Sequence, residues 1–371
     1  MKHKKQPKYL KKKKGFPKIL LIIALILFLL VGTLAGFVWS KLRLINYDDG
    51  TWEPTEPVAG ETIPGETIPG ETTPPEEEGQ SEQIVDISGL EHQQNPPKIP
   101  VHKLVERDDV INILVLGTDD YGGRLTHAAR SDAMILMSIN KTENTVKLVS
   151  LERGMGVPVL EGEYEGQYDW LTHIFRYGGS ELVCKTVEHC FGVEVDHYVR
   201  VTFKTVTTVV DAIGGIYVDM SAAEANSIAN FYLERGNYEL ARRQEGINYL
   251  DGAGALQFAR LRRIDSDWQR IGRQRRVILA AVEALKGASL KQLNDLLDTT
   301  LPLIQTDMSM LEIAEMMLYA PTFLTSEFDQ MTIPKEGTYG GMTGMQGRGL
   351  FAVDFEVNSQ ILKDFLYGTE E

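Results

Sequence analysis

One stretch near the start of the chain is uncharged and strongly apolar. Residues 19–39 read ILLIIALILFLLVGTLAGFVW. As a helix they span roughly 31 Å, which matches the hydrocarbon core of a bilayer. Nine lysines lie within residues 1–18, and Lys41 and Arg43 follow the stretch. A cleaved signal peptide would have a shorter apolar core that ends in small residues. The sequence therefore predicts an uncleaved membrane anchor.

Charge is divided sharply along the chain, although the whole carries a formal net charge of −14. Residues 1–46 sum to +11, residues 47–100 to −12 and residues 101–371 to −13. The positively charged segment that flanks a membrane-spanning helix normally stays on the cytoplasmic side. We therefore expect a single-pass cell membrane protein with residues 1–18 inside, 19–39 spanning and the rest outside. An acidic large domain also argues against a nucleic-acid partner, since phosphate would repel it.

Residues 40–100 have the composition of a linker. A five-residue repeat begins at Gly60, Gly65 and Gly70 and reads GETIP, GETIP and GETTP, and acids and prolines are frequent in the segment. No apolar period supports a core there. We expect a spacer that holds residues 101–371, a single large domain, away from the membrane. The alternative is a segment that binds a partner.

The large domain alternates between strand and helix patterns. Apolar or alternating runs predict strands at 110–116, 133–139, 146–151, 197–203, 216–220 and 329–333. Helical patterns predict helices at 180–190, 204–213, 267–286, 289–299, 309–319 and 356–367. This order predicts an α/β domain with a central sheet and helices on its faces. Cys184 and Cys190 lie on different sides of one predicted helix, so we expect free thiols, or a bridge if that helix ends before Cys190.

Arginines are concentrated in one short region. Within residues 260–276 they are Arg260, Arg262, Arg263, Arg270, Arg273, Arg275 and Arg276, with no lysine among them. A guanidinium group binds phosphate or carboxylate through a planar fork. On a helix from residue 267, Asp267, Arg270 and Gln274 fall beside the apolar stripe and are expected to point into a crevice. Arg276 falls far from them and is expected to be a surface charge. The alternative is a helix with surface salt bridges only.

A second polar group lies at the ends of the first strands. Asp119 follows the strand 110–116, Arg130 and Asp132 precede the next strand, and Arg153 ends the third. We expect these residues at one sheet edge if the strands are antiparallel or cross over. Two carboxylates suit Mg²⁺ when water and phosphate oxygens complete its shell. The pattern indicates phosphoryl or pyrophosphate chemistry, with a structural Asp–Arg network as the alternative.

Six segments resemble the LytR-CpsA-Psr family. They are NILVLGTDD (112–120), RSDAMILMSIN (130–140), VSLER (149–153), RYGG (176–179), VDAIGGIYVDM (210–220) and GALQFARLRR…DWQRIGRQRRVI (254–278). The resemblance implies an outward-facing protein of Gram-positive type, with an α/β/α domain, a lipid-binding apolar pocket and Mg²⁺, Mn²⁺ being the alternative ion. It also implies transfer of a glycopolymer, such as teichoic acid or capsule, from an undecaprenyl-pyrophosphate carrier onto peptidoglycan. The protein would contact membrane lipid while it does so.

The resemblance also implies residue roles. Metal binding falls on Asp119 and Asp132, which form the catalytic set together with Arg153. Pyrophosphate binding falls on Arg130, Arg153, Arg260, Arg262 and Arg270, with Asp267 and Gln274 as neighbours. The family usually continues the strand-end arginine with Asp, whereas this chain has Gly154. Glu152 alternates to the other side of the strand, so we do not expect it to replace that acid.

Two other functions fit the same residues. A hydrolase would cleave the same pyrophosphate with water in place of the acceptor hydroxyl. A non-catalytic envelope regulator, including a transcriptional attenuator, would bind without turnover. DNA binding conflicts with the expected topology, because the arginines would lie on the far side of the membrane from the chromosome.

Overall fold

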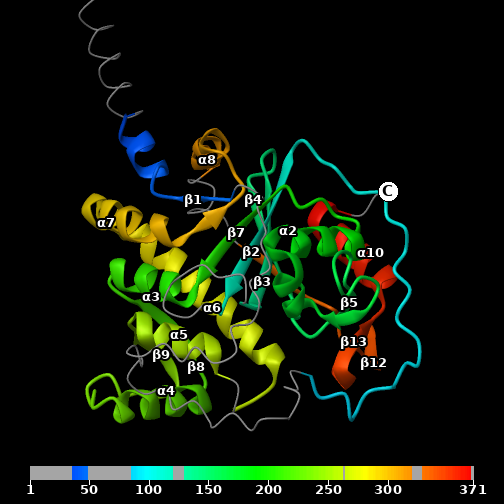
Figure 1. Cartoon of the computed structure of the whole chain (residues 1–371). Coiled ribbons are helices and arrows are strands. Elements are labelled where there is room, and N and C mark those ends of the chain that lie inside the picture. The colour runs from blue at the N-terminus through cyan, green and yellow to red at the C-terminus, as the bar shows by residue number, and fades with distance from the viewer. Residues whose placement is uncertain (1–35, 49–84, 120–128, 262–263, 320–327, 369–371) are drawn as a thin grey trace, which may run out of the picture.

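The computed structural model describes residues 36–48, 85–119, 129–261, 264–319 and 328–368 (Figure 1). Among these residues a seven-stranded mixed sheet forms the centre of the molecule. In spatial order its strands are β1 (Asn46–Tyr47), β10 (Gln305–Thr306), β7 (His197–Thr202), β2 (Val110–Thr118), β3 (Ser131–Asn140), β4 (Thr145–Leu151) and β11 (Phe328–Ile333). β2 pairs antiparallel with β3 and parallel with β7, and β4 pairs parallel with β11. The predicted central sheet is confirmed.

Five of the six predicted strands belong to this sheet, and the sixth does not. β8 (Ile216–Met220) pairs with β9 (Gly246–Leu250) in a separate antiparallel hairpin. Its residues alternate between buried and exposed, so only one face of β8 packs against a core. That core is a second apolar cluster, formed with α4 (Ala222–Glu234) and α5 (Gly252–Arg260). A strand that needs to bury only one face does not require a place inside the main sheet.

Helices cover both faces of the sheet (Figure 1). α2 (Leu171–Phe191) and α10 (Phe355–Tyr367) lie on one face. α3 (Phe203–Ala212), α5 and α6 (Asp267–Lys286) lie on the other. The remaining elements are α7 (Leu290–Thr300), α8 (Met310–Met316), the hairpin of β5 (Gly156–Pro158) and β6 (Tyr168–Trp170), the hairpin of β12 (Tyr339–Thr343) and β13 (Gly349–Val353), and the 3₁₀ turns Leu301–Leu303, Met317–Tyr319 and Met345–Gly347. The predicted α/β/α layering is confirmed.

A pair of glycines divides α2 into two helical parts. Gly179 has a φ of 67°, in the left-handed region that glycine adopts without strain. The part after this kink matches the helix predicted for residues 180–190. It carries Cys184 and Cys190, which are free thiols as expected.

α6 has the predicted bounds and brings its first turn to the sheet edge. Ile271 and Val277 are buried along its apolar stripe. Ile278 and Leu279 pack against a small apolar cluster from β3 and β4. This packing holds α6 across the sheet, so that Asp267 at its start lies beside Arg153, just after the end of β4.

The expected linker 40–100 differs from the structure at its start. Residues 36–42 are helical, and Leu42 and Ile45 are buried against the domain. β1 then pairs in parallel with β10, and Lys41 Nζ lies 2.5 Å from Asp298 Oδ1. A two-residue strand has too little length to show a period in the sequence, so this docking was not predictable from local pattern.

The expected linker also differs at its end. Val85 is 2% exposed and belongs to the main apolar core, so residues before 101 are part of the folded domain. The predicted cytoplasmic tail 1–18, nearly all of the predicted span 19–39, and residues 49–84 lie outside the described residues. Within the described ranges, no helix has both the length and the apolar character needed to cross a membrane.

Candidate functional site

Three strand ends meet at one edge of the sheet. Because β3 runs antiparallel to both β2 and β4, the end of β2, the start of β3 and the end of β4 lie together. Arg130 donates from its backbone N–H and from Nε to the Asp119 carboxylate, at 2.5 and 2.9 Å. The Asp119 N–H donates in return to the Arg130 carbonyl at 3.1 Å. The prediction that these residues share one sheet edge is confirmed.

A buried ion-pair network joins β3, the end of β4 and α6. Arg153 Nη1 donates to Asp132 Oδ1 at 2.6 Å, while its Nε and Nη2 face Asp267 at 3.3 and 3.5 Å. Arg270 binds Asp267 with Nε and Nη2 at 2.7 and 2.8 Å, and its Nη1 donates to the Asp132 carbonyl at 3.1 Å. Both arginines are almost fully buried. The network therefore fixes the first turn of α6 against the sheet edge.

The two arginines control the ionisation of Asp267. Burial alone would raise the pKa of Asp267, but the hydrogen bonds and charge of Arg270 and the charge of Arg153 outweigh burial and hold the pKa well below its usual range. Burial acts to lower the pKa of Arg153, yet the charges of Asp132 and Asp267 raise it above its usual value. Asp267 and Arg153 are therefore both ionised at neutral pH.

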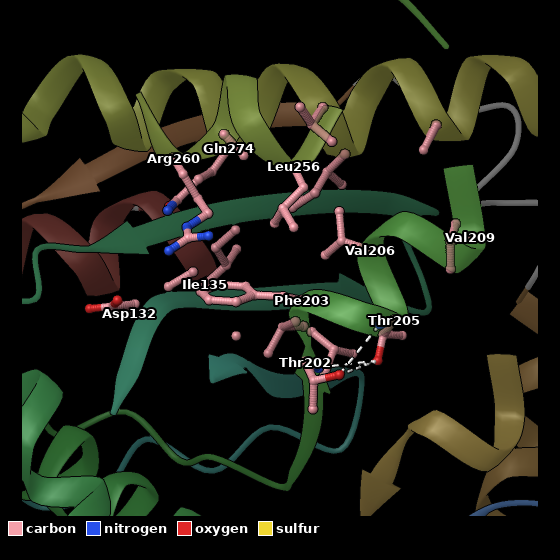
Figure 2. Close-up of a pocket in the computed structure, with 18 of the residues that line it drawn as sticks. Asp132, Ile135, Thr202, Phe203, Thr205, Val206, Val209, Leu256, Arg260 and Gln274 are labelled. Carbon is pink, nitrogen blue, oxygen red and sulfur yellow. Dashed lines mark hydrogen bonds between the residues drawn. The ribbon is translucent and has the colours of Figure 1, made fainter. Parts of the chain in front are cut away.

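An apolar cavity of about 320 Å³ opens beside this network (Figure 2). Its walls come from β2, β3, β4 and β7 and from α3, α5 and α6. Asp132, Arg260 and Gln274 lie at one end, and Val209 lies at the other (Figure 2). The Arg260 guanidinium lies 4.4 Å from the centre of the Phe203 ring, a cation–π contact. The cavity can hold an apolar chain with an anionic group at its polar end.

The structure brings eight of the nine predicted site residues into neighbouring groups. The groups are the pair Asp119 and Arg130, the network of Asp132, Arg153, Asp267 and Arg270, and the cavity wall with Arg260 and Gln274. Asp132 and Arg270 belong to both the network and the wall, so the two are continuous. The ninth residue, Arg262, lies outside the described residues.

Arg276 lies at the surface, with its side chain 37% exposed, but it is not the simple surface charge that its helix position suggested. It donates to the Asp219 carbonyl at 2.7 Å and to both carboxylate oxygens of Glu224 at 2.5 and 3.1 Å. Glu224 also accepts from Arg273, which is fully buried. The helical wheel correctly directs Arg276 away from the cavity. It could not show that a buried glutamate from α4 meets it there.

Glu152 is the site neighbour that sequence reasoning placed wrongly. β4 ends at Leu151, so the alternation of a strand no longer decides where the next side chain lies. The Glu152 side chain is fully buried, and its carboxyl lies close enough to Asp267 for that charge to raise its pKa. The sequence signal that could have identified it is a lone acid directly before the strand-end Arg153.

Gly154 has no room for a side chain. A Cβ there would lie 2.1 Å from Cγ2 of Val85. We expect Gly154→Ala to lower the free energy of unfolding by about 1–3 kcal/mol, as overpacked cores do, measured by denaturant unfolding. The loss should shrink in a Val85→Ala background, because that change removes the clashing methyl group. An equal loss in both backgrounds would contradict the steric argument.

The donor set at the sheet edge suits Mg²⁺ only together with a ligand. Asp119 and Asp132 each offer carboxylate oxygens, and each already accepts hydrogen bonds from an arginine. Mg²⁺ is commonly bound by one or two carboxylates, with water and phosphate oxygens in the remaining positions. Within the described residues there is no group of three or more His, Cys, Asp or Glu that could hold a metal. Asp119 and Asp132 therefore fit Mg²⁺ as two carboxylate ligands, with the phosphate oxygens of a ligand and water completing its coordination.

Comparison with known proteins places this site in a family. The LytR_cpsA_psr family pattern matches residues 76–362. The teichoic acid transferase TagU of Halalkalibacterium halodurans is 29% identical over 210 residues, which cover 56% of this chain and 64% of that protein. TagT of Bacillus subtilis (strain 168) is 32% identical over 195 residues, or 52% of this chain and 58% of TagT.

The chain thus covers less than two thirds of the length of these curated relatives. The solved structure of TagT bound to LI-WTA has a TM-score of 0.54 and 26% identity to this chain. That likeness covers 70% of this chain and 91% of the solved one. The matched residues include the sheet edge, the arginine network and the cavity, and the chain belongs to the LytR_cpsA_psr family.

Proposed function

We propose that this protein is a membrane-anchored transferase that moves a glycopolymer from an undecaprenyl-pyrophosphate carrier onto peptidoglycan. The observation that carries the proposal is the cavity, which is mainly apolar and has Asp132, Arg260 and Gln274 at one end, with Arg270 bound to the Asp132 carbonyl. Apolar walls suit a polyprenyl chain, and arginine forks suit a pyrophosphate. The relatives named as teichoic acid transferases, and TagT bound to LI-WTA, support a teichoic acid or a similar polymer as the cargo.

The proposed reaction is a phosphoryl-type transfer. A hydroxyl oxygen of peptidoglycan forms a bond to the phosphorus that carries the glycopolymer, and the bond from that phosphorus to the bridging oxygen breaks. Polyprenyl phosphate leaves, and the hydroxyl proton passes to water. Arg153, Arg260 and Arg270 would stabilise the charge that grows on the phosphate oxygens. Asp267 orients Arg270 before the substrate arrives, so little reorganisation is needed.

Asp119 and Asp132 would hold the metal ion in this proposal. Mg²⁺, with Mn²⁺ as the alternative, would neutralise phosphate charge when bound. Asp119 directly follows β2 and Asp132 lies near the start of β3, so both acids are at the same sheet edge, where the arginine network meets the cavity. Their own arginine partners keep both carboxylates oriented in the absence of a ligand.

We expect Asp119→Asn and Asp132→Asn to weaken metal binding at least tenfold, because an amide oxygen carries no charge to attract the ion. Mn²⁺ titration followed by electron paramagnetic resonance, with a pyrophosphate analogue present, would measure it without relying on turnover. Asp329→Asn is the control, since it changes an exposed carboxylate of β11. Equal Mn²⁺ affinity in all three variants would contradict the assignment.

The proposed location is the cell membrane, with the described domain outside the cytoplasm. The apolar stretch 19–39 of the sequence runs directly into the helix 36–42, where Phe37 and Trp39 are half exposed. Aromatic residues favour the membrane interface. Only three residues separate this helix from β1, which is fixed in the sheet. The domain would therefore sit directly on the bilayer surface, and this position gives its cavity access to a lipid carrier.

The test is a transfer assay with purified full-length protein, a lipid-linked glycopolymer and peptidoglycan fragments. The proposal expects polymer bound to peptidoglycan and free polyprenyl phosphate to appear together, and only when the acceptor is present. Equal release of polyprenyl phosphate without an acceptor would identify a hydrolase instead. Binding of the carrier without any turnover would identify a non-catalytic regulator.

A further inference from the structure

Glu152 is a buried acid that the proposed reaction does not use directly. It follows β4, and its side chain is completely shielded from solvent. Its Oε1 accepts a hydrogen bond from the Gly154 N–H at 3.2 Å. Its Oε2 is equally buried and receives no hydrogen bond from a donor among the described residues. The side chain that interacts with the Glu152 carboxyl is Asp267, which offers only carboxylate oxygens. A buried carboxylate oxygen without a donor is costly when it is charged, and much less so when it holds a proton.

Charged and titratable groups surround Glu152 from several parts of the fold. Asp267 and Arg270 act on it from α6, and Arg153 is its neighbour at the end of β4. Tyr339 faces it from β12. Neither arginine donates a hydrogen bond to Glu152 in the structure. Arg153 donates to the carboxylates of Asp132 and Asp267. Arg270 donates to the Asp267 carboxylate and to the Asp132 carbonyl.

The charge balance of the network leaves no positive charge for a third carboxylate. Two guanidinium groups face the two carboxylates of Asp132 and Asp267. If Glu152 ionised, its charge would lie beside Asp267 and compete with any bound phosphate for both arginines. Burial first, and then the charge of Asp267, raise the pKa of Glu152 to about 8, although Arg270 acts in the opposite direction.

We propose that Glu152 is a positioning residue that works as a neutral carboxylic acid. It keeps a proton on Oε2 beside Asp267, and this proton leaves the charge of Arg153 and Arg270 available to the pyrophosphate. The proposal rests on the proposed function, because the pyrophosphate is the group that the arginines would bind. It assigns Glu152 no contact with the reacting atoms.

The sign of the pH effect follows from this role. At neutral pH Glu152 is protonated, and the anionic ligand meets arginines balanced by two carboxylates only. As pH rises through the folded pKa, Glu152 loses its proton, and the new negative charge repels the ligand. Affinity for a pyrophosphate ligand should therefore fall by up to about tenfold per pH unit on the alkaline side, with the effect in KM more than in kcat.

The experiment compares wild type, Glu152→Gln and Glu188→Gln as full-length proteins. Geranyl pyrophosphate is the probe, and calorimetry measures its binding from pH 6.5 to 9.5. Glutamine has the shape of glutamic acid and stays neutral, so Glu152→Gln should bind as wild type does at pH 7 and should keep that affinity at pH 9. Glu188 is a half-buried glutamate on α2 whose pKa burial also raises. Glu188→Gln should keep the alkaline loss of wild type.

Calorimetry in two buffers of different ionisation enthalpy gives a second readout, which needs no variant. Wild type should take up protons on binding the probe at pH 8.5, because the bound anion favours the protonated form of Glu152. An alkaline loss retained in Glu152→Gln, a tenfold weaker binding of that variant at pH 7, or no proton uptake by wild type would each overturn the proposal. No binding of the probe by wild type at any pH would instead reject the proposed function of the site.

Discussion

Asp267→Ala should lower the free energy of unfolding by about 3–5 kcal/mol, the usual cost of removing one partner from a buried ion pair. Two nearly buried arginines, Arg153 and Arg270, share this carboxylate. Arg270 loses the acceptor of two of its three hydrogen bonds and becomes a buried charge with only the Asp132 carbonyl to bind. Denaturant unfolding at pH 7 measures the loss, and transfer activity should fall with it, because Arg270 is no longer oriented toward the cavity.

The control is Glu356→Ala, which removes an exposed acid from the first turn of α10. Both acids interact with the dipole of a helix N-terminus, and that interaction contributes only about 0.3–1 kcal/mol. The difference between the two losses therefore isolates the arginine network from the helix dipole. If Asp267→Ala costs no more than Glu356→Ala, the network is not what holds α6 to the sheet.

The same network makes stability sensitive to acid. The folded pKa of Asp267 is lowered to about 2, below its unfolded value near 4. The ionised Asp267 therefore makes its full contribution to the free energy of unfolding above its unfolded pKa, and that contribution is lost as pH falls towards the folded pKa. The stability of Asp267→Ala should change less than that of wild type over this acidic range.

The sequence predicted the parts of the fold that local pattern determines. The runs that became β2 and β3 are mainly apolar over seven residues, the run that became β4 alternates between apolar and polar residues, and α6 carries an apolar stripe. Long elements of this kind show their period clearly, and short connections then limit how neighbouring strands pair. The gathering of Asp119, Asp132 and Arg153 at one edge was expected if the strands paired antiparallel or crossed over, and β3 pairs antiparallel with both β2 and β4.

Pairings between distant segments were not predictable in the same way. β1 meets β10 across more than 250 residues, and neither strand is longer than two residues. Val85 packs against Gly154 although it follows a segment with the composition of a linker. Such contacts depend on the shape that the rest of the domain has already formed, and local periodicity carries no signal of that shape.

For the candidate site, the sequence predicted the positions of the side chains but not their partners. A helical wheel places Asp267 and Arg270 beside the apolar stripe, yet it cannot show that Arg153 binds the same carboxylate. It also cannot show that Glu152, beyond the end of β4, lies close to both. These relations appear only when α6 is packed across the sheet, because the chain between β4 and α6 exceeds one hundred residues.

Arg270→Lys should lower kcat/KM for transfer at least tenfold, equivalent to a loss of about 1.5–3 kcal/mol for charged hydrogen bonds. Lysine keeps the positive charge but has a single nitrogen. Arg270 uses Nε and Nη2 for Asp267 and Nη1 for the Asp132 carbonyl. One ammonium group cannot replace that planar fork, although lysine is as good a helix former as arginine. Steady-state kinetics with a lipid-linked substrate measures the effect.

The control for this variant cannot be Arg276→Lys, because Arg276 binds the buried Glu224 and its loss would disturb α4. The exposed Arg242 is the better choice, and Arg242→Lys should change kcat/KM by less than twofold, since exposed charges contribute little.

Three of the five N–H groups of Arg270 donate to Asp267 and to the Asp132 carbonyl, so two are left for a ligand in the cavity that Arg270 lines. If these two N–H groups bind the pyrophosphate, Arg270→Lys should weaken substrate binding even under conditions where the variant is fully folded. A variant that loses stability yet binds the carrier as wild type does would make Arg270 a structural brace, and Arg153 and Arg260 would then bind the phosphate groups without it.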